Sequence, residues 1–139
     1  MKRTAFVSLF VLTFAVLACS FGTGGSDKAV RANELQAEFD KLPAGDAAQG
    51  EQIYLAQPCH TCHTDLTVGP AFPGDSPLAV RAVTRKPGYP AELYIYESIV
   101  APNAEIVPGF QQDIMPGDFR QTLTDQELAD LIAYLMTIK

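Results

Sequence analysis

Apolar residues near the carboxyl end of the chain follow the period of an α-helix. Four large side chains are spaced at i, i+3, i+4 and i+7 and share one helical face: Leu128, Leu131, Ile132 and Leu135. Residues 124–127 are Thr, Asp, Gln and Glu, a capping box in which the first and last residues cap a helix reciprocally. The pattern therefore predicts a helix that starts after Thr124.

Weaker patterns predict further helices. Asp46 is of the residue type that caps helices, and a helix is expected from there to about residue 57. Pro90 suits a first helical turn, so a second helix is expected over 91–100. Before Pro90 the chain is rich in Gly and Pro, and at most a turn or two of helix is expected, over 79–84. No alternating run indicates a strand, so the expected class is all-α.

Uncharged apolar residues fill the amino-terminal end of the chain. Lys2 and Arg3 precede Thr4–Ala18, a run of about 15 residues, whereas a membrane-spanning helix needs roughly 20. This layout is typical of a secretory signal peptide, which is predicted over 1–18. The run ends in Val-Leu-Ala-Cys, which resembles the lipobox of bacterial lipoproteins, so Cys19 is expected to be lipidated. An ordinary signal sequence and an uncleaved anchor are the alternatives.

Residues 19–42 are expected to connect this lipidated Cys19 to a folded domain over 43–139. The stretch 20–28 is rich in Gly and Ser and is predicted to be a flexible tether. A short amphipathic helix is predicted over 29–42, with a disordered extension of the tether as the alternative. The helix is favoured by three apolar residues at helical spacing, namely Leu35, Phe39 and Leu42.

Composition narrows the function classes. The 139 residues are enough for one domain, and the formal net charge of −6 makes nucleic acid a poor partner. The count of 3 Cys is odd, so a framework of disulfides is not expected. The domain over 43–139 has few large apolar side chains between its short helices. Something other than side chains is therefore expected to fill its centre.

One motif supplies that centre. Cys59-His60-Thr61-Cys62-His63 is C-x-x-C-H, the attachment signature of c-type haem. Two thiols at this spacing reach the two vinyl groups of one porphyrin edge, and His63 then lies beneath the ring as an iron ligand. A structural zinc site needs four ligands, and His60 is the only other His. A redox dithiol belongs in an α/β pattern, which the sequence lacks.

A second iron ligand is expected from a methionine. Met115 lies in an Ile-Met-Pro-Gly loop that could reach over the other face of the haem. Met136 lies on the final helix and is more simply explained as packing. Met115 is therefore predicted as the axial ligand, and a buried gap-filling role beside five-coordinate iron is its alternative.

With these motifs, Asp46–Ile138 resembles a class I monohaem cytochrome c. The resemblance implies three to four short helices and long loops wrapped around one covalently bound haem c. Gly69-Pro70 matches the Gly-Pro of that family, in which the Pro carbonyl accepts a hydrogen bond from the haem-binding His. Pro70 is therefore implied as the partner of His63.

The same resemblance implies a close crossing of the first and last helices of the domain. Four residues fit the family pattern, with a generic core role as the alternative: Gly50, Tyr54, Leu131 and Tyr134. Partners for the haem propionates are expected among Arg81, Arg85 and Tyr89. Arg81, Arg85 and Lys86 are also expected to form a locally basic rim for docking. Glu127 and Asp130 are expected on a helix surface, solvated.

A finer resemblance concerns residues 94–119 and the lipobox. Together they resemble the lipoprotein cytochrome subunit of alternative complex III, a bacterial quinol-oxidising complex, and similar stretches also occur in cytochrome c domains fused to haem–copper oxidases. The predicted function is single-electron transfer in a respiratory or photosynthetic chain, as a lipid-anchored subunit of such a quinol-oxidising complex. Redox proteins are its expected partners on the extracytoplasmic side of the membrane. The chain is not expected to be an enzyme by itself.

Three alternatives remain open at this stage. The first is a free-standing periplasmic carrier that delivers electrons to a terminal oxidase or reaction centre. The second is a haem sensor or gas-binding cytochrome with open iron. The third is a subunit whose haem is mainly structural.

Overall fold

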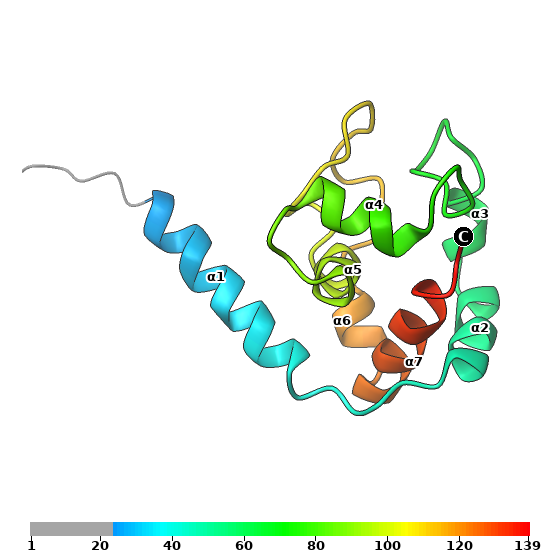
Figure 1. The fold of residues 1–139 in the computed structure, drawn as a ribbon, viewed down its shortest axis with the longest axis horizontal. Helices are drawn as coiled ribbons and strands as arrows, with labels where there is room; N and C mark the ends of the chain where they lie inside the picture. Colours follow the sequence, from blue (N-terminus) through cyan, green and yellow to red (C-terminus); the bar gives the residue numbers. More distant parts are fainter. Residues whose placement is uncertain (1–23) are drawn as a thin grey trace, which may run out of the picture.

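A computed structural model describes residues 24–139, with side chains from residue 31 onward. The described part contains helices joined by loops and no strand, which confirms the predicted all-α class (Figure 1). Its helices follow in the order α1 (Gly24–Phe39), α2 (Ala47–Ala56), α3 (Cys59–Cys62), α4 (Leu78–Arg85), α5 (Ala91–Val100), α6 (Phe119–Thr122) and α7 (Asp125–Leu135).

The first and last helices of the domain, α2 and α7, lie side by side (Figure 1). At the crossing, a Cβ added to Gly50 would lie 1.9 Å from the carbonyl oxygen of Asp130. The rings of Tyr54 and Tyr134 meet there with centroids 5.3 Å apart, and Leu131 is buried. The predicted crossing is confirmed. Gly45 makes an equally close approach to α7 that the sequence did not indicate.

The predicted helix starts are confirmed in detail. Asp46 accepts hydrogen bonds from the backbone N–H groups of Ala48 at 2.8 Å and Gln49 at 3.3 Å, which caps α2. Thr124 and Glu127 form the capping box: the Glu127 N–H donates to Thr124 Oγ1 at 3.2 Å, and the Thr124 N–H donates to Glu127 Oε2 at 2.8 Å. Helix α5 begins after Pro90, as expected.

Three elements differ from the prediction. Helix α1 begins at Gly24 rather than residue 29, inside the predicted tether, and ends at Phe39. Once its docked last turn has formed, each further residue extends the helix at little cost. The short helices α3 and α6 were not predicted, because single turns carry too little periodic signal.

Asp130 corrects the prediction of a solvated carboxylate. It lies in the middle of α7 and is only 6% exposed. Its carboxylate accepts hydrogen bonds from the Asp46 N–H at 2.7 Å and from Gln126 Nε2 at 2.8 Å. These bonds satisfy a group that would otherwise be costly to bury, and they tie α7 to the start of α2.

Helix α1 projects from the body and touches it only near its carboxyl end (Figure 1). Leu35 is buried, and the ring of Phe39 lies 5.8 Å from that of Tyr96 on α5. The Tyr96 hydroxyl donates to Glu38 at 3.0 Å. The last turns of α1 are therefore fixed on α5.

The predicted signal peptide over 1–18 and the lipidated Cys19 lie outside the described residues. Within the described part, none of the helices is both long enough and apolar enough to cross a membrane.

Candidate functional site

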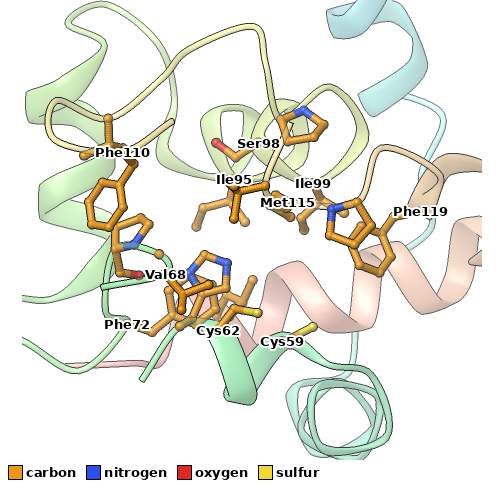
Figure 2. Close-up of a pocket in the computed structure, with 18 of the residues that line it drawn as sticks. Cys59, Cys62, Val68, Phe72, Ile95, Ser98, Ile99, Phe110, Met115 and Phe119 are labelled. Carbon is orange, nitrogen blue, oxygen red and sulfur yellow. Dashed lines mark hydrogen bonds between the residues drawn. The ribbon is translucent and has the colours of Figure 1, made fainter. Parts of the chain in front are cut away.

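A largely apolar cavity lies at the centre of the domain, between α3, α5, α7 and the two long loops that follow α3 and α5 (Figure 2). Its side chains come from segments far apart in the sequence. Its apolar lining includes Val68, Phe72, Leu78, Ile95, Ile99, Ile106, Val107, Phe110, Phe119, Leu131 and Leu135. This is the gap that the shortage of large core residues predicted, and it suits a flat apolar group.

The single turn of α3 brings the predicted attachment residues to this cavity. Cys59 and Cys62 both line it and are not joined by a disulfide. They are three residues apart on the turn, so their thiols lie on the same side. The backbone N–H of His63 donates to the Cys59 carbonyl at 2.9 Å and closes the turn. Burial raises the pKa of the Cys59 thiol.

His63 has a defined ring orientation. Its Nδ1 lies 2.8 Å from the carbonyl oxygen of Pro70, the partner that the resemblance implied. Because a carbonyl only accepts, Nδ1 carries the proton and the lone pair is on Nε2, the form that binds a metal. Phe72 stacks on the imidazole with centroids 4.0 Å apart. Burial lowers the pKa of His63, and the charge of Arg85 lowers it further, whereas the hydrogen bond to Pro70 acts in the opposite direction. The neutral imidazole is therefore favoured.

The two candidate methionines are separated by the structure. Met115 lines the cavity, on the side opposite the thiols of Cys59 and Cys62 (Figure 2). Met136 is the C-cap residue of α7 and does not line this cavity. It borders a separate surface groove together with Phe39 and Ile132. The geometry thus brings Met115, and not Met136, to the group of predicted site residues.

Arg81 binds backbone carbonyls rather than lying at the cavity or in an exposed basic rim. Its guanidinium donates to the carbonyls of Ser76 at 3.1 Å and Ala71 at 2.7 Å, and also to that of Phe72. These three bonds hold the loop that follows Pro70. Arg81 is therefore a support for that loop, not part of an exposed basic rim.

Lys86 also departs from the predicted rim. Its ammonium pairs with the buried carboxylate of Glu97 and lies 3.9 Å from the centroid of the Tyr89 ring. The side chain of Lys86 is only 19% exposed, so its charge is both neutralised and covered. The prediction of a basic docking rim at 81–86 is wrong, because two of its three charges are used inside the fold.

Arg85 is the third residue of the predicted basic rim, and it lines the cavity. Among the described residues that line it, Arg85 is the one Lys or Arg. Tyr89 does not line the cavity, and its buried hydroxyl has no hydrogen-bond partner in the described part of the chain. Of the three residues considered as partners for propionates, Arg85 is the one with direct access to the cavity.

The residues present fit a covalently attached haem. Two thiols, a neutral His and a Met sulfur converge on one apolar space, with one cation available to an acidic substituent. No group of three His, Cys, Asp or Glu side chains in the described residues could hold a bare metal ion. An all-α domain with such a site is a c-type haem protein.

Comparison with known families agrees with this class. The cytochrome c family matches residues 47–139, and the chain belongs to that family. A search of curated proteins and a search of solved structures each returned no significant match. As in the rest of the family, the cofactor is haem c, bound through Cys59 and Cys62 in the C-x-x-C-H stretch, and the protein is an electron-carrying haem protein. Haem c supplies a one-electron couple between ferrous and ferric iron.

Proposed function

We propose that the chain is a membrane-anchored, single-electron carrier with His63 and Met115 as its two axial ligands. The observation that carries this proposal is the position of Met115 across the cavity from Cys59 and Cys62. A Met on one side and a neutral His on the other leave no open position for a substrate. Such a pair favours electron transfer over gas binding and raises the reduction potential.

The ligand assignment is tested with the two methionines. In the ferric holoprotein, Met115→Ala should abolish the weak far-red band of Met-ligated haem, lower the potential and allow carbon monoxide to bind after reduction. Met136→Ala is the matched control and should leave all three unchanged. Carbon monoxide binding by the unaltered ferrous protein, without denaturant, would favour the sensor instead.

The chain's own residues have separate tasks in this proposal. The carbonyl of Pro70 holds the Nδ1 proton of His63, so that Nε2 faces the cavity. Arg85 provides the positive charge for a propionate of the bound group. The apolar lining excludes water, which strengthens these electrostatic contacts and limits reorganisation around the site.

The anchor rests on the amino-terminal sequence. A lipidated Cys19 carrying two or more acyl chains would hold the protein firmly at a membrane surface, facing the extracytoplasmic side. Cys19→Ser should release the protein into the soluble fraction without changing its haem spectrum. Continued membrane residence of that variant would point to an uncleaved helix or to tight subunit contacts.

We further propose that the carrier is a subunit of a quinol-oxidising assembly of the alternative complex III type. The similarity of residues 94–119 to that lipoprotein subunit supports this. Purification from detergent-solubilised membranes should then recover the other subunits at fixed stoichiometry. Recovery of the protein alone would favour the free-standing periplasmic carrier.

A further inference from the structure

Two polar side chains close the neck of the loop that precedes Met115. Asn103 Nδ2 donates to Asp113 Oδ1 at 2.7 Å, and the Asp113 backbone N–H donates to Asn103 Oδ1 at 3.0 Å. The two bonds are reciprocal, so both residues must be in place for either to form well. They bring together positions ten residues apart in the sequence.

The backbone at Asp113 makes this contact specific. Its φ of 61° is the only positive φ of a non-glycine residue in the described part of the chain. Asp and Asn tolerate this left-handed conformation better than other residues with a side chain. The conformation turns the chain two residues before Met115. The same residue therefore shapes the backbone and supplies half of the contact.

The segment enclosed by the two residues forms a wall of the cavity. Ile106, Val107 and Phe110 line it, and the chain then runs through Asp113 to Met115, which lines it as well (Figure 2). The loop is held locally by the Phe110 N–H, which donates to the Val107 carbonyl at 3.1 Å. In Figure 1 the tip of this yellow loop extends beyond α4. The contact between Asn103 and Asp113 at the neck therefore restrains the position of the loop relative to the cavity.

We propose that Asn103 and Asp113 form a latch that positions Met115 at the cavity. The inference rests on the proposed role of Met115 as an axial ligand. A latched loop keeps the sulfur in place, whereas an unlatched loop spends more time displaced and leaves the position open. An external ligand that competes with Met115 binds in proportion to the open fraction, so its apparent affinity reports the latch.

The test uses imidazole binding to the ferric holoprotein. Asn103→Ala removes both hydrogen bonds and should tighten the apparent imidazole affinity by about three- to thirtyfold, in line with the loss of one or two modest hydrogen bonds. Asp113→Asn tolerates the same φ, keeps the acceptor and the backbone donor, and should remain within twofold of the unaltered protein. Asp113→Gly keeps only the backbone donor, so its apparent imidazole affinity should lie between those of Asn103→Ala and the unaltered protein.

A control separates positioning from general destabilisation. Thr124→Ala removes the N-cap of α7 at a residue that does not line the cavity, and should reduce the stability of the fold while leaving imidazole affinity within twofold. An equal affinity change in Asn103→Ala and Thr124→Ala would overturn the latch, as would no change in Asn103→Ala. If Met115→Ala also keeps the far-red band, the ligand assignment fails and the latch fails with it.

Discussion

Gly50 lies against the carbonyl oxygen of Asp130 so closely that any side chain at residue 50 must displace α7. A Cβ there would be 1.9 Å from that oxygen and 2.8 Å from the Cβ of Tyr134. Gly50→Ala should therefore lower the free energy of unfolding of the holoprotein by about 2–3 kcal/mol, despite the better helix propensity of Ala. Guanidinium denaturation followed by circular dichroism measures this loss.

Gly117 is the matched control for that substitution. A methyl group added at this residue would meet no other atom within 4 Å, and its φ is not positive. Gly117→Ala should stay within about 0.5 kcal/mol of the unaltered protein. A similar loss at both glycines would mean that the crossing does not depend on close approach at Gly50.

Arg81 should matter to both stability and potential. Its guanidinium bridges three carbonyls of the loop at 71–76, including that of Phe72, whose ring stacks on His63. An ammonium cannot reproduce this fork, so Arg81→Lys should cost about 1–3 kcal/mol of unfolding free energy. Because the loop also supports His63, the reduction potential measured by voltammetry should shift.

The control for Arg81 lies on the same helix. Val80 is 51% exposed, and Val80→Thr should change neither stability nor potential appreciably. An unchanged potential in Arg81→Lys, with stability lost, would limit Arg81 to a structural role.

Removing one partner of the Lys86–Glu97 pair should destabilise the fold, whereas replacing both partners by apolar residues should not. The side chains are only 19% and 7% exposed, so removal of the cation leaves a carboxylate without its partner in the interior. Lys86→Met should lower the unfolding free energy by about 2–4 kcal/mol. The double variant Lys86→Met/Glu97→Leu should recover most of this loss in thermal unfolding. No recovery would show that the packing of Lys86 on Tyr89 dominates.

Alkaline pH should weaken the docking of α1. Burial, together with the hydrogen bond to Glu38, raises the pKa of Tyr96 to about 12 from its ordinary value of 10.0. The protonated phenol is thus favoured in the folded state, and its contribution to stability is complete below pH 10 and lost as the pH rises through 12. Tyrosinate absorbance should show a transition near that pH, missing from Tyr96→Phe. A transition that persists in Tyr96→Phe would assign it to another tyrosine.

Local signals in the sequence predicted much of the site. The capping box at Thr124, the C-x-x-C-H turn and the Pro70 partner each depend on residues that are close along the chain. Met115 could be separated from Met136 because a Pro- and Gly-flanked residue is seldom helical core. These features are visible without knowing the tertiary fold.

Contacts between distant segments could not be predicted in this way. The burial of Asp130 depends on a backbone donor at Asp46, 84 residues away. The hydrogen bonds of Arg81 depend on the path of the loop at 71–76. The pairing of Asn103 with Asp113 depends on the left-handed backbone conformation of Asp113. The prediction of exposed charge at 81–86 was wrong for the same reason. The composition of a segment does not reveal which of its charged side chains pair with distant groups when the chain folds.

Helix α1 has a mechanical consequence for the whole molecule. Its 16 residues correspond to a rod of about 24 Å, fixed at one end by Phe39 and Glu38 on Tyr96. A force applied at the far end of this rod would act through the Tyr96 contacts on α5, whose Ile95 and Ile99 line the cavity. The contacts on Tyr96 therefore set the direction in which α1 leaves the domain.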